Sequence, residues 1–375
     1  MKIKGLLIKL TSLALAAVCS LSFISCSKDI FSGVESTEDE LRVVGKVGDY
    51  EVCYDELYYL IMSCKDIMKG KYGSDIWKTE ASAAEYADEL CDMVMERITA
   101  NYAVFIFSEE NGIKTPLKNK EIVEAVNDQI NYTLYEIASN NGIEVTMDEK
   151  LNGDIVYNYE AGGVALAEKI FKEALDETYL TERAMRISIA AETAFSMLVN
   201  SLSGKGEIIY SDADIEKFML SDEFICTKHV FVSGLSEESL NRASAALTEL
   251  HAGTPMDNLI AGKYNDDVTA TPDGYYFTRG EMESAYEEAA FSLNEGEFSG
   301  IVATDIGYFI IERCEKSTSH MLANISTYSK QIIYAQVNDL VSERQAKLSL
   351  ELSDFGKSLE FYKIAVSEEN KGDIK

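Results

Sequence analysis

The feature that most constrains this chain is a change of periodicity at about residue 222, in a sequence that is helical on both sides of it. Before this point, apolar residues recur every three or four positions, which is typical of amphipathic helices. Over residues 222–315 the pattern becomes strand, helix, helix, strand, and helical spacing returns after residue 316. Only 3 Pro residues occur in 375, so we expect short or helical linkers. We therefore predict an α+β protein with a β-containing segment inserted into a mostly helical lobe.

The helical regions on both sides each carry a predicted strand. Residues 42–52 alternate apolar and polar positions around a Gly-Asp turn, which indicates a strand or hairpin. At the other end, one helix is expected to run to about residue 352, and residues 359–366 have the pattern of a strand. Because a strand lies near each end, we expect the two terminal regions to share one lobe.

The N-terminus has the order of a processing signal. A basic start is followed by a short apolar run and by a small residue directly before Cys26. This order resembles a bacterial lipobox, although Phe23 and Ile24 replace the usual Leu and Ala. The resemblance implies cleavage before Cys26 and lipidation of its thiol, with an ordinary signal peptide or a single anchor helix as the alternative.

The polar and acidic residues 27–41 are expected to form a flexible tether. No later stretch is long and apolar enough to span a bilayer. We therefore expect an extracytoplasmic protein, attached to the bacterial cell membrane by its lipid anchor only. The formal net charge of -30 makes binding to nucleic acid unfavourable and favours solubility.

The cysteines do not have the spacing of a metal site. The chain has seven, none in a CxxC arrangement, and it has no His/Cys ligand cluster and no phosphate-cradling glycine loop. We therefore predict no metal and no cofactor. Five cysteines remain beyond Cys26, so at least one thiol is expected to be free, and pairing between Cys226 and Cys314 is left open.

The inserted segment contains, in this order, the stretches "KHVFV", "YYFTRGEM", "YEEAAFSLNEGEFSGIV" and "DIGYFIIER". In these stretches and in their order it resembles the parvulin-type peptidyl-prolyl isomerases (the PpiC or rotamase family). It implies a small antiparallel sheet flanked by helices. Helical regions on both sides of such a domain, in a lipoprotein, resemble the PrsA/SurA-type extracytoplasmic foldases.

This wider resemblance implies a role in folding exported proteins. The expected partners are unfolded or partly folded exported chains with X-Pro bonds, and a homodimer is left open. The predicted organisation is a signal peptide at 1–25, a lipidated tether at 26–41, an N-terminal helical chaperone region at 42–221, a parvulin-type isomerase domain at 222–315, a C-terminal helix and strand completing the chaperone lobe at 316–366, and a tail at 367–375.

The resemblance also assigns two polar site residues. His229 matches the strand histidine of the family, and Asp267, in "YNDD", stands where members carry Asp or Cys beside that histidine. Together they are expected to polarise the rotating amide through hydrogen bonds, without covalent attack. The alternative for His229 is a core histidine whose hydrogen bonds are made within the protein. The alternative for Asp267 is a loop carboxylate that stabilises a turn.

Four further residues are assigned to substrate binding. Phe277, Met282 and Tyr286 match positions that wall the family's proline pocket, with Met282 and Tyr286 one helical turn apart. They could equally be ordinary core residues. Phe309 is placed in the same pocket, where many members carry a second histidine.

Two departures predict reduced activity. No imidazole pair can form with Phe309 in that position, and the family's "GGDLG" run appears only as "TPDGY". The main alternative is therefore a catalytically weak or inactive chaperone that holds unfolded chains. A structural lipoprotein with a borrowed fold is a further alternative.

Overall fold

The computed structural model of the protein describes residues 29–150, 155–270, 272–304 and 306–364. Two compact units can be distinguished within them. The first combines the chain up to Cys64 with Ala84–Asn200 and the residues from Glu343 onward, and the second combines Lys65–Ala83 with Ser201–Ser342. The predicted isomerase segment at 222–315 lies inside the second unit, which also takes in residues before and after it.

The first unit contains the predicted N-terminal hairpin. Strands β1 (Val43–Val47) and β2 (Tyr50–Cys53) pair antiparallel, as the alternating pattern indicated. The third strand of this sheet, β9 (Glu351–Leu352), pairs antiparallel with the other edge of β1. Strands near the two ends of the chain therefore do share one sheet.

The C-terminal strand predicted at 359–366 is wrong in position. Helix α14 (Asp354–Ser358) and the 3₁₀ helix η3 (Phe361–Lys363) occupy the end of the described chain, and the strand lies earlier, at β9. The apolar alternation there is explained by a turn that buries Phe361. The preceding helix α13 (Ile325–Gln345) also ends earlier than expected.

Helices make up most of the first unit, with one antiparallel strand pair that the sequence did not predict. Strands β3 (Val145–Glu149) and β4 (Ile155–Tyr159) pair over their full length. The alternation of "VTMDE" is weak, because a single apolar pair is followed by two acids. The elements up to residue 205 are α2 (Tyr54–Tyr72), η1 (Ser74–Trp77), α3 (Glu80–Ala84), α4 (Ala87–Glu110), η2 (Pro116–Lys118), α5 (Lys120–Asn140), β3, β4, α6 (Gly163–Glu177) and α7 (Glu182–Lys205). Of these, η1 and the parts of α2 and α3 within Lys65–Ala83 belong to the second unit.

The prediction of a flexible tether at 26–41 is wrong for the residues around Ile30 and Phe31. Ile30 is fully buried, its N–H donates to Leu117 O at 3.0 Å, and its carbonyl accepts from Arg186 at 3.0 Å. The Arg183 guanidinium lies 4.7 Å from the centre of the Phe31 ring. These residues are therefore packed onto the first unit, whereas the predicted signal peptide and Cys26 lie outside the described residues.

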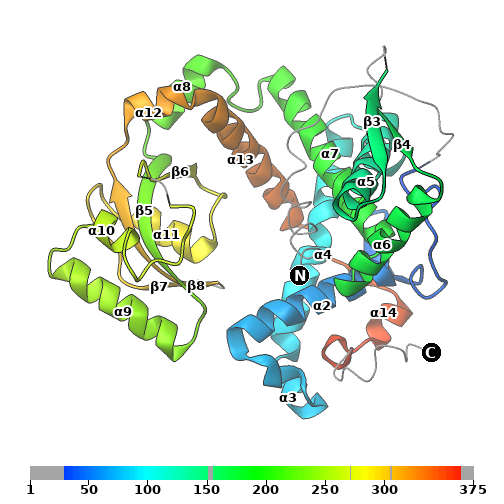
Figure 1. Cartoon of the computed structure of the whole chain (residues 1–375), viewed down its shortest axis with the longest axis horizontal. Helices are drawn as coiled ribbons and strands as arrows, with labels where there is room; N and C mark the ends of the chain where they lie inside the picture. Colours follow the sequence, from blue (N-terminus) through cyan, green and yellow to red (C-terminus); the bar gives the residue numbers. More distant parts are fainter. Residues whose placement is uncertain (1–28, 151–154, 271, 305, 365–375) are drawn as a thin grey trace. The chain divides into compact units, whose positions relative to one another are not determined.

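The second unit is built around a four-stranded antiparallel sheet with the order β6-β5-β8-β7 (Figure 1). The long central strand β5 pairs with β6 on one side and with β8 on the other. This is the small antiparallel sheet that the resemblance implied. The strands are β5 (Phe224–Ser233), β6 (Tyr275–Thr278), β7 (Val302–Thr304) and β8 (Gly307–Cys314), and the helices around them are α9 (Glu237–His251), α10 (Met256–Ile260) and α11 (Ser284–Ser292).

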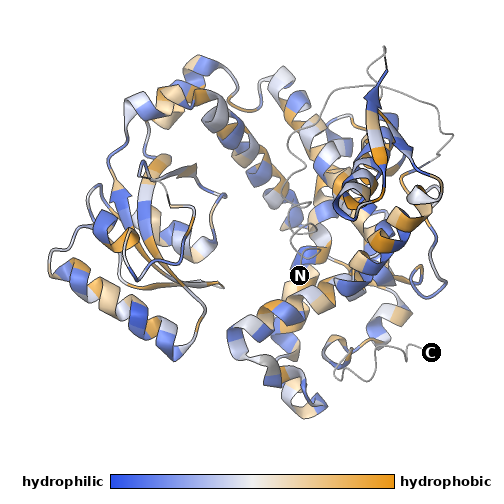
Figure 2. Cartoon of the chain, viewed as in Figure 1, coloured by the Kyte–Doolittle hydropathy of each residue, from blue (hydrophilic) through white to orange (hydrophobic). Residues whose placement is uncertain are grey.

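The two faces of this sheet bury different sets of side chains. On one face Val230 and Val232 pack against α9 and α10. The amphipathic character of α9 is visible as alternating hydrophilic and hydrophobic residues in Figure 2. On the other face Ile225 packs with residues of α11. Because side chains alternate along a strand, His229 must lie on the α11 face.

Lys316 joins the two ends of the sheet domain. Its ammonium group donates to the carbonyl oxygens of Met219, Ser221 and Phe224 at 3.1, 2.5 and 2.9 Å. Desolvation lowers the pKa of this lysine. The chain segments that enter and leave the domain are therefore held together by one charged side chain.

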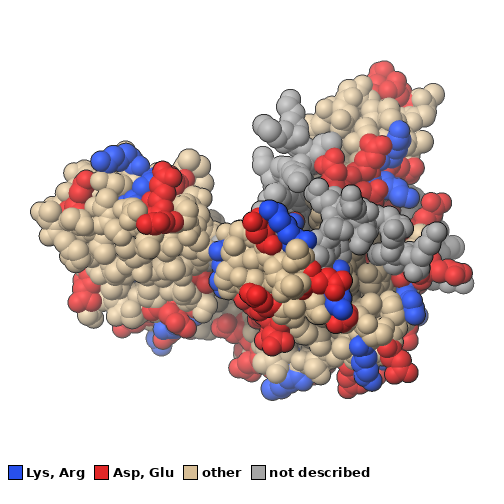
Figure 3. All heavy atoms as spheres, turned by 90° about the horizontal axis from the view of Figure 1, so that it is seen from below, with Lys and Arg blue, Asp and Glu red and all other residues tan. Residues whose placement is uncertain are grey.

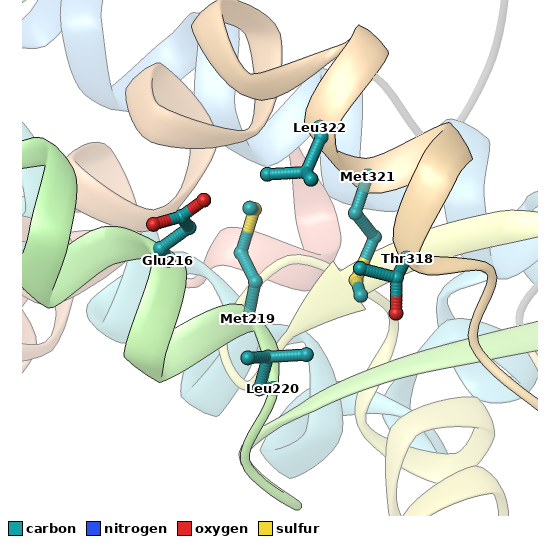
Figure 4. Close-up of a pocket in the computed structure, with 6 residues that line it drawn as sticks. All are labelled: Glu216, Met219, Leu220, Thr318, Met321 and Leu322. Atoms are coloured by element: carbon teal, nitrogen blue, oxygen red, sulfur yellow. The ribbon is translucent and has the colours of Figure 1, made fainter.

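A small apolar pocket lies beside the entering and leaving segments, where α8 (Asp212–Met219) meets α12 (Thr318–Ala323) (Figure 4). Leu322 is 45% exposed here. The pocket is lined by Glu216, Met219, Leu220, Thr318, Met321 and Leu322.

The surface of the protein is predominantly acidic, as its 64 Asp and Glu residues against 34 Lys and Arg residues require. On the face shown in Figure 3, acidic side chains are spread over the surface rather than gathered in one patch. Among the helices that the structure describes, none combines the length and the apolar character needed to cross a bilayer.

Candidate active site

His229 lies in the middle of β5, with its ring almost fully enclosed. The residue is 8% exposed, and both ring nitrogens have partners. Nδ1 lies 2.9 Å from the Tyr286 hydroxyl of α11, and Nε2 lies 3.2 Å from Asp267 Oδ2. The structure therefore brings the two predicted polar residues into direct contact.

The loop that carries Asp267 is held against β5 by its neighbours. The Asn265 side-chain oxygen accepts from the backbone N–H of Phe231 at 2.9 Å, and the backbone N–H of Asp266 donates to Phe231 O at 2.7 Å. The Asp266 carboxylate accepts from Arg242 at 2.8 Å. Asn265 and Asp266 thus bond to the backbone of β5 at Phe231, as a neighbouring strand would. These bonds fix the position of the Asp267 side chain.

The carboxylate of Asp267 accepts four hydrogen bonds. Oδ1 accepts from the backbone N–H and the hydroxyl of Thr269, at 2.8 and 2.7 Å. Oδ2 accepts from His229 Nε2 and from the Tyr275 hydroxyl. Burial raises the pKa of Asp267, but the hydrogen bonds from Tyr275 and Thr269 outweigh this effect, and the pKa is lower than usual.

These contacts determine the protonation of His229. Burial lowers the pKa of the imidazole, although the Asp267 carboxylate opposes this effect, so the ring is neutral at pH 7. A carboxylate only accepts, so the proton is on Nε2, and Nδ1 accepts from Tyr286. Thr227 Oγ1 lies 2.8 Å from the Tyr286 hydroxyl and completes the chain.

Three aromatic rings enclose the imidazole. Tyr275 is stacked on His229, with ring centres 4.8 Å apart and planes 7° apart. Phe309 and Tyr286 meet the ring edge-on, at 5.0 and 5.5 Å. Phe309 therefore packs directly against His229. It occupies the position where many parvulins carry a second histidine.

Sequence reasoning missed Tyr275, which it treated only as a departure from the family's glycine-rich run. The structure places it against both predicted polar residues. Gly274 precedes it with φ +80°, and a Cβ there would lie 2.7 Å from Thr227 O, so the close approach to β5 requires glycine. The available signal was strand alternation, because Tyr275 and Phe277 point to the same face of β6.

The four predicted substrate-binding residues differ in burial. Phe277, Tyr286 and Phe309 are 0%, 3% and 9% exposed, and they belong to one apolar cluster with Ile311. Met282 is half-buried at the edge of this cluster. The assignment of these four residues to a proline pocket stays a prediction. Met282 is the most exposed of the four.

One buried group of potential metal ligands lies in the first unit. Cys53, Asp55 and Glu56 could each offer one ligand atom within 4.8 Å of the others. The Arg183 guanidinium already lies 2.9 Å from Asp55 and 2.8 Å from Glu56. These charges are compensated by the protein itself, so the cluster is an ion-pair network.

Cys226 and Cys314 are directly opposite each other on β5 and β8. Both are free thiols in this structure. The Cys226 thiol donates to Asp273 O at 3.4 Å.

Comparison with known proteins agrees with this geometry. Residues 223–317 match the family described as the PPIC-type PPIASE domain. The solution structure of NmPin, the parvuline of Nitrosopumilus maritimus, is 33% identical, covers 25% of this chain and 97% of that chain, and has a TM-score of 0.21. By the family match, residues 223–317 are a PPIC-type, or parvulin-type, peptidyl-prolyl cis-trans isomerase domain.

Three further similarities concern two named relatives. "Peptidyl-prolyl cis-trans isomerase ssp-1" of Neurospora crassa is 55% identical over 79 residues, which are 21% of this chain and 39% of the relative. "Foldase protein PrsA" of Bacillus subtilis is 29% identical over 124 residues, 32% of this chain and 40% of the relative. The crystal structure of PrsA from Bacillus subtilis covers 82% of this chain and 91% of its own, with 18% identity and a TM-score of 0.25.

Proposed function

We propose that this protein catalyses cis-trans isomerisation of X-Pro peptide bonds at the His229–Asp267 pair. Rotation about a peptide bond has a barrier of roughly 20 kcal/mol, because amide resonance must be broken. No covalent bond is made or cleaved. A catalyst has only to bind the twisted amide better than either planar form.

The observation that carries this proposal is the contact of the His229 imidazole with the Asp267 carboxylate, set among aromatic rings. A twisted amide has lost much of the charge separation of its resonance form, so weakly polar surroundings favour it over the planar amide. The half-buried side chain of Met282 would contact the proline ring, while His229 and Asp267 orient the carbonyl and nitrogen of the rotating bond. The role of Phe309 is to hold the edge of the imidazole.

The test is the exchange rate of a proline tetrapeptide, measured by NMR on the purified protein. His229→Ala and Asp267→Asn should each lower the catalysed rate by at least about tenfold, which is about 1.4 kcal/mol in activation free energy. His251→Ala is the matched control, because this histidine is exposed on α9 and contacts Phe298. Thermal unfolding of each variant must resemble that of the wild type. Wild-type rates in both site variants would contradict the assignment.

A second candidate function is the binding of unfolded chains without catalysis. The burial of Phe277, Tyr286 and Phe309 favours it, because residues inside a core are less available to a proline ring. Under this alternative the protein would suppress aggregation of an unfolded client, and the exchange rate of the tetrapeptide would not change.

The location and clients of the protein form a separate part of the proposal. We infer a foldase for exported proteins, outside the cytoplasmic membrane and anchored through lipid on Cys26. The order of the N-terminal residues and the similarity to a foldase support this inference. Mass spectrometry of the processed N-terminus tests it, and Cys26→Ala should release the protein from the membrane fraction.

A further inference from the structure

Tyr275 contacts both polar residues of the site at once. Its ring lies flat on the imidazole of His229, and its hydroxyl donates to Oδ2 of Asp267. The same carboxylate oxygen accepts from His229 Nε2. Oδ2 of Asp267 therefore accepts hydrogen bonds from both His229 and Tyr275.

The backbone of Tyr275 is held by neighbours that are independent of these contacts. It pairs with Thr227 in the β5–β6 ladder, directly after Gly274. The next residue, Tyr276, accepts from Gln331 through its carbonyl at 2.8 Å and from the Ser317 N–H through its hydroxyl at 3.0 Å. The ring of Tyr275 is thus presented to His229 from a fixed position.

The contacts have two physical consequences. The stacked ring covers one face of the imidazole and restricts its rotation. The hydroxyl shares the negative charge of Asp267, so the carboxylate attracts a second proton on the imidazole less strongly.

We propose that Tyr275 is a positioning residue of the active site, which fixes the ring plane of His229 and keeps the imidazole in its neutral, Nε2-protonated form beside an ionised Asp267. The part of this inference that concerns catalysis rests on the proposed isomerase function. The part that concerns the state of His229 can be measured without any activity.

The titratable groups that face the imidazole come from three elements: Asp267 from its loop, Tyr275 from β6 and Tyr286 from α11. Phe309 of β8 and Thr227 of β5 do not titrate in the accessible range. The neighbouring Asp266 is directed to Arg242, with which it forms an ion pair at 2.8 Å.

The decisive variant is Tyr275→Phe, which keeps the ring and removes the hydroxyl. We expect the pKa of His229 to rise by about 0.5–1 unit, which corresponds to the net worth of one hydrogen bond. The readout is NMR titration of the imidazole Cε1–H in the whole protein. The pH-rate profile of tetrapeptide exchange should move on its acid side in the same direction and by the same amount.

Tyr132→Phe is the matched control. Tyr132 of α5 donates to Glu136 Oε1 at 2.9 Å, so it loses the same kind of bond without touching His229. It should leave the His229 titration and the exchange rate unchanged. Tyr275→Leu, which also removes the stacked ring, should lower the exchange rate further than Tyr275→Phe.

An Asp267→Asn background separates positioning from a general effect on folding. If the hydroxyl acts through the carboxylate, Tyr275→Phe should have no further effect on the His229 pKa once Asp267 is replaced. An unchanged His229 titration in Tyr275→Phe alone would overturn the inference. A wild-type protein without exchange activity would overturn the proposed function instead, and the titration would still decide the role of Tyr275.

Discussion

Two sites in this molecule contain the same kinds of side chain but differ in the base that faces the carboxylate. In the first unit, Glu56 accepts from the Tyr102 hydroxyl and pairs with Arg183. In the second unit, Asp267 accepts from the Tyr275 hydroxyl and pairs with His229. Each site thus joins a carboxylate, a tyrosine and a nitrogen base.

The difference lies in the base. An arginine side chain stays charged at any accessible pH, so the first site has a permanent cation. Desolvation leaves the pKa of Asp55 and of Glu56 above the usual values, although Arg183 opposes this effect for both. Histidine is a weak base, and burial lowers the pKa of His229, so the second site is neutral on one side and can change its charge.

The comparison shows that the choice of base decides whether such a site has a fixed positive charge or one that can change with pH. In the first site, a buried carboxylate pair and a cation that keeps its charge hold α2 and α7 together. The side chains of His229 and Asp267 are 10% and 13% exposed, against 9% for Arg183 and 7% for Glu56, so the two sites differ in the base more than in burial. A base that can change its charge suits the catalytic role proposed for the second site.

The largest expected effect comes from breaking the first site. Arg183→Leu leaves Asp55 and Glu56 buried without their cation, so we expect a loss of about 3–5 kcal/mol in the free energy of unfolding. Urea denaturation followed by circular dichroism measures it. Arg97→Leu, at an exposed arginine of α4, is the control and should cost little. A loss under about 1 kcal/mol in Arg183→Leu would show that the network is not structural.

A smaller effect separates the two tyrosines. Tyr102 is 2% exposed and its partner Glu56 is buried, so Tyr102→Phe leaves a poorly solvated carboxylate and should cost about 1–3 kcal/mol. Tyr275→Phe leaves a carboxylate that keeps three other hydrogen-bond donors, and we expect it to cost under about 1 kcal/mol. Urea denaturation of both variants compares them. Equal costs would contradict the division into a structural site and a responsive site.

The smallest effect is the pH dependence of stability at His229. Its pKa in the folded protein lies below the usual 6.5, so at mildly acidic pH the unfolded chain binds more protons. The stability that neutral His229 contributes is therefore present above about pH 6.5 and is lost as the pH falls towards 5, by at most about 1.4 kcal/mol for each unit of pKa shift.

Urea denaturation of wild type and His229→Gln between pH 7.5 and 5 isolates this contribution. The stability difference between the two proteins should shrink as the pH falls. Asp267, whose pKa is also lowered, loses its own contribution only below about pH 4, so the two effects occupy separate pH windows. A difference that stays constant or grows towards pH 5 would exclude a lowered pKa at His229.

Much of the second unit could be predicted from the sequence, because its signals are local. Strand alternation and the motifs around His229 place this residue on the central strand, and "YNDD" places Asp267 in a loop beside it. The burial of Phe277 and Tyr286 agrees with the core alternative that the pattern left open. The position of Tyr275 in the site could not be predicted from the sequence. Its contacts with His229 and Asp267 form only once β6 has paired with β5 and the loop that carries Asp267 has packed beside both strands.

The sequence by itself determined the periodicity of helices and strands, the N-terminal hairpin and the position of the inserted domain, since each depends on residues a few positions apart. Only the tertiary structure decided that β9 completes the first sheet, that Ile30 is buried, and that Tyr275 lies on His229. In each of these cases the stabilising partner is far away along the chain or in another element. Such contacts leave no periodic signal, because their free energy is gained only after the remote segments have met.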